Sequence, residues 1–114
     1  MSNDNSGYGF YDYFSLQAHY LHNTAKRNGG YGFYMDYPGG QIFTGNVANK
    51  NGSEGIYFDD MGYGNYGNPK SVSNNTANGN SSYGIYAEYG VPNASGNVAS
   101  NNSTSPQCWN VLCN

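Results

Sequence analysis

The chain has 114 residues, enough for one small domain, and a net charge of −3 with only four Lys or Arg residues. So few basic side chains give no electrostatic surface for nucleic acid, and no run approaches the ~18 apolar residues of a membrane-spanning helix. Gly (17) and Tyr (13) are far above ordinary usage.

Composition alone is typical of a disordered, self-associating segment, and this stays an alternative interpretation. The first residues, Met1 to Asn5, lack the basic and apolar regions of a signal peptide. We therefore expect either a protein that stays in the cell or a part of a longer chain.

One pattern recurs along the chain, Asn-x-Ala-x-x-Asn-x-x-x-Gly-(Phe/Ile)-Tyr. Its full copies begin at Asn23, Asn46 and Asn75, and half copies end at Tyr11 and begin at Asn97. The glycines are spaced by 23, 23 and 29 residues, and the first asparagines by 23, 29 and 22. A single insertion, placed within residues 59–69, explains both series. We therefore expect four to five repeats of 22–23 residues.

In chain order, each copy predicts three short strands separated by turns such as Asn28-Gly29 and Asn51-Gly52. The first strand follows the glycine and alternates with period two. Its inward columns are Phe10, Phe33, Ile56 and Ile85, then Asp12, Met35, Phe58 and Ala87. The next strand carries the column Tyr20, Phe43, Val72 and Ala94. The last carries Ala25, Ala48, Ala77 and Ala99.

Strands this short become stable when each copy pairs with the copies above and below it at the ~4.8 Å strand spacing. We expect the asparagines at 23, 46, 75 and 97 to stack as a hydrogen-bonded ladder, with solvated turns as the alternative. We expect the glycines at 9, 32, 55 and 84 to adopt a backbone conformation that other residues resist.

The run from Val72 to Tyr86 resembles the right-handed parallel β-helix repeat of NosD-like and pectate-lyase-like proteins. The resemblance covers about residues 5–102, and it implies an all-β, right-handed parallel β-helix (solenoid) over residues 1–102. That superfamily includes polysaccharide lyases and hydrolases, phage tailspikes, adhesins and cell-surface repeat proteins, so it implies a fold and no single activity. No catalytic motif of a particular lyase or hydrolase is recognisable, and we assign no catalytic residue from it.

Two outward columns of the first strand could bind a ligand. One is a row of aromatic side chains, Tyr11, Tyr34, Tyr57 and Tyr86. The other, two residues further on, is Tyr13, Asp36, Asp59 and Glu88. Aromatic rings stack on sugar faces and carboxylates accept hydrogen bonds from sugar hydroxyls, so together they suit a saccharide. The alternative is that the tyrosines only stabilise the sheet.

Carboxylates stacked on adjacent strands repel one another, which leaves three interpretations of this column. The side chains splay into solvent, or Asp36, Asp59 and Asp60 bind calcium through their oxygens. In the third, Asp36 with Asp59, or Asp59 with Glu88, forms the acid/base pair of a glycosidase, since one strand spacing matches the ~5 Å of a retaining pair. Apart from calcium, we expect no cofactor.

The tail at 103–114 breaks the pattern at Pro106, and we expect it to cap the last turn of the coil. Cys108 and Cys113 either form a disulfide there or stay as free thiols. The first turn begins abruptly at Tyr8, so we expect upstream turns in a longer protein or end-to-end self-association.

Our leading hypothesis is a non-enzymatic binding or structural module, extracellular or at the cell surface, that contacts glycans through the tyrosine and carboxylate columns. The rival is a fragment of a carbohydrate-active enzyme, a polysaccharide lyase or glycoside hydrolase, with Asp36, Asp59 or Glu88 as acid and base.

Overall fold

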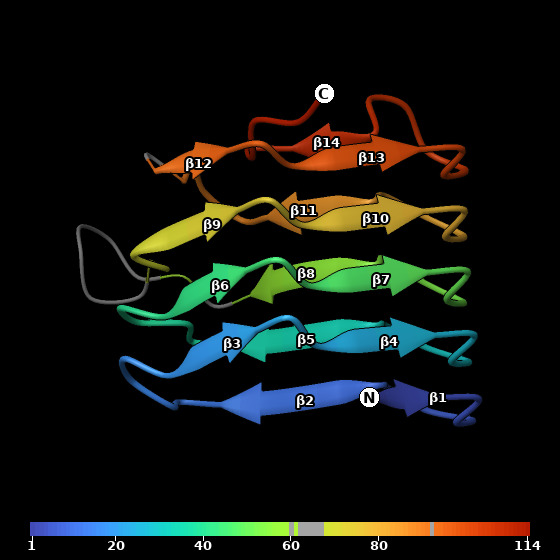
Figure 1. Cartoon of the computed structure of the whole chain (residues 1–114), viewed down its shortest axis with the longest axis horizontal. Coiled ribbons are helices and arrows are strands. Elements are labelled where there is room, and N and C mark those ends of the chain that lie inside the picture. Colours follow the sequence, from blue (N-terminus) through green and yellow to red (C-terminus); the bar gives the residue numbers. More distant parts are fainter. Residues whose placement is uncertain (60, 62–67, 92) are drawn as a thin grey trace.

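The strands of the chain wind into a solenoid whose turns lie one above another (Figure 1). The computed structural model describes residues 1–59, 61, 68–91 and 93–114. Those residues form fourteen strands and no helix that could span a membrane. The strands complete four turns and part of a fifth.

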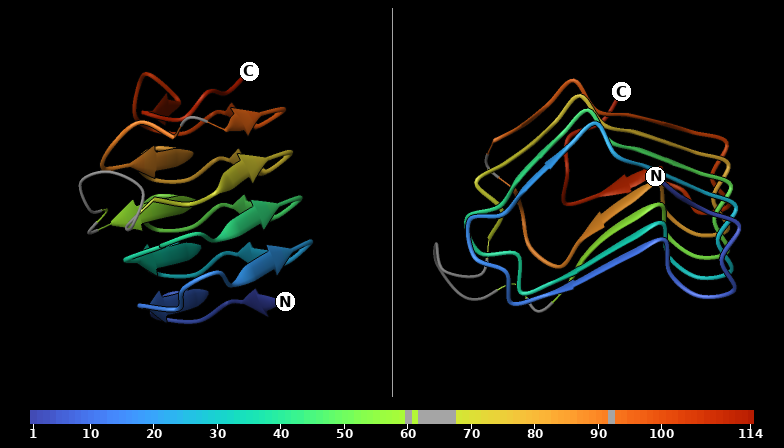
Figure 2. Two further views of the ribbon diagram at one scale, coloured as in Figure 1. Left: turned by 90° about the vertical axis from the view of Figure 1, so that its left-hand side faces the viewer. Right: turned by 60° about the horizontal axis from the view of Figure 1, so that its bottom comes forward.

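Three parallel sheets run along the three sides of the coil, as the tilted view in Figure 2 shows. The first, sheet A, contains β1 (Ser2–Asn3), β4 (Thr24–Lys26), β7 (Val47–Asn49), β10 (Thr76–Asn78) and β13 (Val98–Ser100). The second, sheet B, contains β2 (Phe10–Tyr13), β5 (Phe33–Asp36), β8 (Ile56–Asp59), β11 (Ile85–Ala87) and β14 (Cys108–Trp109). The third, sheet C, contains β3 (His19–Leu21), β6 (Ile42–Thr44), β9 (Ser71–Ser73) and β12 (Ala94–Ser95).

The register places equivalent residues of successive repeats side by side, which confirms the predicted parallel solenoid. Phe33 pairs with Phe10 below it and with Ile56 above it. Because the side chains of a strand alternate between its two faces, this register sends the predicted columns of all three strands inward.

The inward columns meet in one narrow core. Phe33, Phe43 and Phe58 are fully buried, and Phe43 makes edge-to-face contacts with both of the others at centroid distances of 5.1 and 5.3 Å. Ala25, Ala48 and Ala77 are also fully buried, as predicted. Aromatic rings from sheets B and C therefore fill the space that the small alanines of sheet A leave.

Two asparagine ladders run along the coil, one at each end of sheet A. The predicted ladder is confirmed from Asn46 through Asn75 to Asn97, and Asn23 joins it through its backbone nitrogen: Asn46 Nδ2 donates to Asn75 Oδ1 at 3.1 Å and to the Tyr20 carbonyl at 2.7 Å. A second ladder, which the sequence did not lead us to expect, consists of Asn5, Asn28, Asn51, Asn80 and Asn102. Asn51 is 1% exposed, so it is a buried ladder residue rather than a solvated turn residue.

The expectation that the repeat glycines adopt an unusual backbone conformation is wrong. Gly9, Gly32, Gly55 and Gly84 are not among the residues with positive φ. A Cβ on Gly32 would lie 2.5 Å from the Gly55 carbonyl oxygen and 2.7 Å from Asn51 Nδ2. Glycine is needed there because the backbone of the next turn and the second ladder both approach too closely for a side chain.

Positive φ occurs instead at the corners between sheets. The turn from sheet C to sheet A uses His22, Gly45, Asn74 and Gly96 in successive repeats. The turn after sheet A uses Asp4, Arg27, Lys50, Gly79 and Asn101. Most of these residues are not glycine and would disfavour positive φ on their own. Stacking of the turns therefore maintains this backbone conformation.

A polar cluster surrounds Asp12, which in the first turn takes the inward position that Met35 and Phe58 occupy in the next two turns. Asp12 is 8% exposed and accepts hydrogen bonds from the Tyr20 hydroxyl and, at 3.2 Å, from Gln41 Nε2. Burial of a carboxylate is costly without such donors. The cluster therefore explains how an aspartate occupies the column of Met35 and Phe58.

The tail at 103–114 adds a strand to sheet B. β14 pairs with β11, so that Trp109 lies opposite Tyr86. Cys108 and Cys113 form a disulfide, and Asn97 bridges to Cys113. The ladders end on this tail, because Asn102 Nδ2 donates to Gln107 Oε1 at 2.8 Å and Asn97 Nδ2 to the Leu112 carbonyl at 3.2 Å.

Eleven residues separate β8 from β9, whereas five separate β5 from β6, so the extra residues fall where the insertion is predicted. Most of the predicted insertion at 59–69, namely residues 60 and 62–67, lies outside the described residues.

Candidate binding face

The outer surface of sheet B carries most of the aromatic side chains that the core does not use. We call it the tyrosine face and define it by Tyr8, Tyr11, Tyr31, Tyr34, Tyr57, Tyr83, Tyr86 and Trp109 together with Asp36, Glu54, Asp59 and Glu88. The strand register places the predicted tyrosine column and the predicted carboxylate column next to each other on this surface.

The rings of the tyrosine face stack along the solenoid axis. The centroid distances are 5.3 Å from Tyr11 to Tyr34, 5.2 Å from Tyr34 to Tyr57 and 5.2 Å from Tyr57 to Tyr86. Rings stacked in this way cover much of one another's faces and leave mainly their edges exposed. At the two ends of the rows, Tyr8 is 46% and Trp109 is 43% exposed.

Tyrosine hydroxyls hydrogen-bond to the stacked carboxylates, an arrangement that none of the three sequence-based interpretations included. Asp59 accepts from the Tyr34 hydroxyl through Oδ2 and, at 3.4 Å, from the Tyr57 hydroxyl through Oδ1. Asp36 Oδ2 accepts from the Tyr11 hydroxyl at 3.4 Å. The donors offset the repulsion between carboxylates that adjacent strands hold side by side.

The same contacts change the acidity of the phenols. Partial burial, followed by the hydrogen bond to Asp59 and the negative charge of Asp59, raises the pKa of Tyr34 well above its ordinary value. Burial and the charge of Asp59 also raise the pKa of Tyr57. Both hydroxyls therefore remain hydrogen-bond donors across the physiological pH range.

Glu88 behaves differently from the two aspartates. It is exposed, and its Oε2 accepts a hydrogen bond of 3.0 Å from the Met61 amide. Of the calcium candidates, Asp60 lies outside the described residues. Among the residues that the structure does describe, no three His, Cys, Asp or Glu side chains come together to hold a metal ion.

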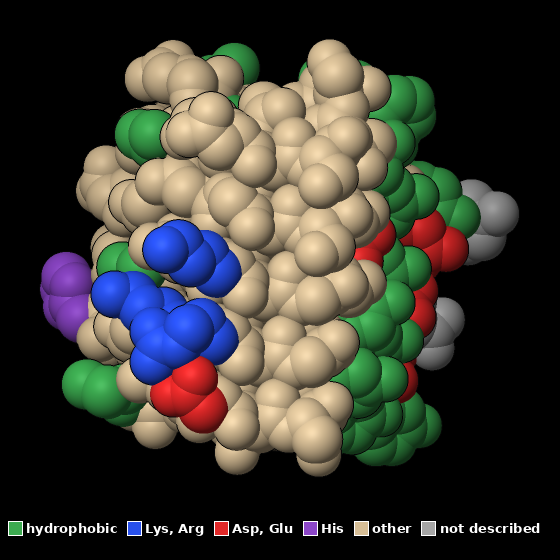
Figure 3. Space-filling model, turned by 90° about the vertical axis from the view of Figure 1, so that its right-hand side faces the viewer, with side chains coloured by type: hydrophobic (Ala, Val, Ile, Leu, Met, Phe, Trp, Pro, Cys, Tyr) green, Lys and Arg blue, Asp and Glu red, His purple; other side chains and the backbone are tan. Residues whose placement is uncertain are grey.

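Charge is distributed unevenly around the coil. Figure 3 shows the Lys and Arg side chains on a different part of the surface from the strip of hydrophobic and acidic side chains. Lys26, Arg27 and Lys50 lie in or just after sheet A, and Arg27 is paired with Asp4 at 2.7 Å. The tyrosine face contains four carboxylates and no Lys or Arg, so it is acidic.

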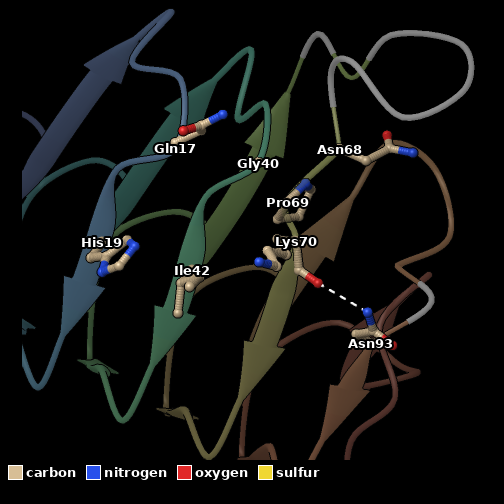
Figure 4. A pocket seen from close by; sticks show the side chains of 8 residues that line it. All are labelled: Gln17, His19, Gly40, Ile42, Asn68, Pro69, Lys70 and Asn93. Carbon is tan, nitrogen blue, oxygen red and sulfur yellow. Dashed lines mark hydrogen bonds between the residues drawn. The ribbon is translucent and has the colours of Figure 1, made fainter.

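A groove of about 450 Å³ lies on the outside of sheet C (Figure 4). It is lined by Gln17, His19, Gly40, Ile42, Asn68, Pro69, Lys70 and Asn93. The lining residues come from four successive turns, and Asn93 Nδ2 donates to the Lys70 carbonyl at 3.2 Å. None of the predicted site residues lines this groove.

The sequence predicted the four-residue tyrosine column and missed its continuation. Trp109 extends the column by one turn, and Tyr8, Tyr31 and Tyr83 add a second row beside it. The spacing held the signal for Trp109, which follows Tyr86 by 23 residues. The Gly that marks each repeat is replaced there by Gln107, so the copy is hard to recognise.

Three parallel sheets wound into one coil around an apolar core, with buried asparagine ladders at both ends of sheet A, define the protein as a parallel β-solenoid. The chain belongs to the right-handed β-helix family, because the family profile described as right handed beta helix region matches residues 1–111. No match was found among curated proteins or among solved structures. Membership sets the coil as right-handed and leaves the ligand to be argued from the residues of this chain.

Proposed function

We propose that the chain is a non-enzymatic β-helix binding module whose tyrosine face contacts a polysaccharide. The observation that carries the proposal is the row of neighbouring rings from Tyr11 to Tyr86, which the strand register extends to Trp109, with carboxylates beside it. Its repeat along the axis is one strand spacing, so it offers an extended polymer the same contacts turn after turn.

Hydroxyls and carboxylates supply the polar contacts of this face. Asp36 and Asp59 retain lone pairs that can accept hydrogen bonds from sugar hydroxyls. Trp109 and Tyr8, at the two ends of the rows, offer partly exposed ring surfaces for stacking. The combination suits a ligand that has both apolar faces and many hydroxyl groups.

The charge of the face restricts the class of polymer. With four carboxylates and no cation, it favours neutral or amine-bearing sugars and repels polyuronates. A location at the cell surface or outside the cell is part of the proposal, since the Cys108–Cys113 disulfide suits an oxidising compartment.

Affinity electrophoresis in gels that contain a neutral glucan, an amine-bearing glycan or a polyuronate tests the proposal. We expect retardation by the first two and none by the third. Tyr57→Leu and Trp109→Ala should abolish the retardation, whereas Thr24→Ala on sheet A should not change it. Normal migration in every gel, with circular dichroism showing an intact fold, would overturn the proposal.

The enzyme alternative is favoured by one observation, that Asp36 and Asp59 are paired in register on neighbouring strands. Incubation with the same polymers separates the two functions. Release of reducing ends or unsaturated products, lost in Asp59→Asn, would establish the enzyme and exclude a purely binding role.

A further inference from the structure

Tyr34 stands at the centre of a cluster of phenol rings on the tyrosine face. Its ring centroid lies 4.9 Å from Tyr31, 5.2 Å from Tyr57 and 5.3 Å from Tyr11. Tyr34 and Tyr57 belong to adjacent strands, β5 and β8, and are paired directly in the register. Their rings are tilted by 38° and not strictly parallel, so one edge of each ring leans toward the other.

A single carboxylate serves both of these phenols. Asp59 accepts the Tyr34 hydroxyl with one oxygen and the Tyr57 hydroxyl with the other. The other neighbours of Tyr34 differ in this respect. The Tyr11 hydroxyl donates to a different carboxylate, Asp36, at 3.4 Å, and the strongest charge near the Tyr31 phenol is that of Glu54.

We propose that Tyr34 and Tyr57 are a site of oxidative cross-linking, in which a one-electron oxidant joins the two rings as dityrosine and Asp59 takes up the phenol protons. The product would tie the second and third turns of the solenoid together by a covalent bond. The inference does not depend on the proposed polysaccharide ligand.

Coupling of the two phenols removes two electrons and two protons from the protein. Each phenol gives one electron to the oxidant and its hydroxyl proton to Asp59, which passes it to solvent, and a neutral phenoxyl radical remains. The two radicals form a carbon–carbon bond between ring positions ortho to oxygen. The two ortho hydrogens then move to the phenolic oxygens, which restores both aromatic rings, and the protein has lost two hydrogen atoms in total.

The protonation state of the phenols makes the carboxylate important. A phenol with the ordinary pKa near 10 is already protonated at neutral pH, and burial and Asp59 raise the pKa of Tyr34 further. Electron loss must therefore be accompanied by proton transfer, and a base already hydrogen-bonded to the phenol provides the shortest path for it.

Exposure alone would predict a different product. Tyr11 is 56% and Tyr13 is 65% exposed. An oxidant that reacted with the most solvent-accessible rings would therefore modify these two and couple separate molecules. Proximity and the shared base instead select Tyr34 and Tyr57 within one molecule. The position of the cross-link therefore distinguishes our proposal from unselective oxidation.

The experiment treats the full-length chain at low concentration with a haem peroxidase and limiting hydrogen peroxide. We expect dityrosine fluorescence, a monomer lighter by the mass of two hydrogen atoms, and a cross-linked peptide pair that contains Tyr34 and Tyr57. Tyr34→Phe and Tyr57→Phe should each abolish this product, and Tyr31→Phe should retain it.

Asp59→Asn keeps the size of the side chain and removes the base, so the initial rate of cross-linking should fall by at least about tenfold. Asp36→Asn is the matched control one turn away and should react like the unmodified protein. A product that joins mainly Tyr8, Tyr11 or Tyr13, or that joins separate molecules, would overturn the proposal. An Asp59→Asn variant that folds and reacts at the original rate would overturn the role of the carboxylate.

Discussion

Buried amides are the residues on which the fold depends most directly. Asn51 Nδ2 donates to the Asn80 side chain at 3.0 Å and to the Ala25 carbonyl at 3.2 Å. Its Oδ1 accepts from the backbone and side-chain nitrogens of Asn28. Four hydrogen bonds thus converge on one side chain that is almost fully buried.

Asn51→Ala should destabilise the protein strongly, because two nitrogen donors and one carbonyl lose their partner inside the coil. We expect the free energy of unfolding to fall by about 3 kcal/mol. Asn5→Ala removes an exposed member at the end of the same ladder and should cost about 1 kcal/mol or less. Urea unfolding followed by circular dichroism measures both, and equal losses would contradict the central role of burial.

Glycines of the repeat support the same ladder by leaving room for it. Gly32→Ala would place a Cβ within 3 Å of backbone and ladder atoms, and we expect a loss of about 2 kcal/mol or more. Gly7→Ala serves as the control, since nothing lies within 4 Å of its added Cβ and its φ is unstrained. A thermal midpoint that shifts equally in both variants would show that chain flexibility, and not contact, decides the effect.

At this scale the sequence predicts side-chain direction better than side-chain partners. The inward direction of Phe33 and Phe58 follows from the sequence, because side chains alternate between the two faces of a strand and the apolar ones share one face. The hydroxyl contacts between Tyr34 and Asp59 were missed, because they cross from one turn to the next by a diagonal that the spacing of columns does not specify.

The strands of sheet B form the element on which the candidate site rests. β5 and β8 hold Tyr34, Tyr57 and both aspartates, and their rings and carboxylates support one another. The same elements show why β14 was missed. Gln107 occupies the repeat position of Gly84. No asparagine of a further turn has to fit against the backbone there, and the Gln107 side chain itself provides the acceptor that ends the ladder.

The raised phenol pKa values predict how the stability of these strands depends on pH. In the unfolded chain a tyrosine ionises near pH 10, whereas burial and Asp59 keep Tyr34 and Tyr57 protonated to higher pH in the folded state. Above about pH 10 the unfolded state therefore binds fewer protons than the folded state, and the free energy of unfolding decreases as the pH rises.

Urea titrations at a series of alkaline pH values measure this decrease. Tyr34→Phe and Tyr57→Phe should each make it less steep, and Tyr13→Phe, an exposed ring on the same sheet, should leave it as it is. A decrease that is equally steep in all four proteins would mean that other groups cause it.

On the scale of the whole molecule, each turn contacts only the turns next to it, and stability is therefore distributed along the axis. The tail at 103–114 contributes to the last turns alone. It accepts the amide hydrogens of Gly84 and Val91 through the carbonyls of Gln107 and Asn110 at 2.8 and 3.1 Å. The Cys108–Cys113 disulfide closes this segment next to the final ladder residues.

Replacement of both cysteines by serine should therefore loosen one end of the coil rather than the whole of it. For a loop of this length the chain-entropy model gives a loss of about 2 kcal/mol, and amide exchange should show where it falls. The amides of Gly84, Val91 and Ala99 should exchange faster in the double variant, since their acceptors lie in the tail. The amide of Phe33, bonded to the Gly55 carbonyl at 2.9 Å, should be unaffected. A repeat stack with only neighbour contacts should confine the faster exchange to the end where the disulfide was lost. Equal acceleration along the whole chain would contradict this and would show that the turns unfold as a single cooperative unit.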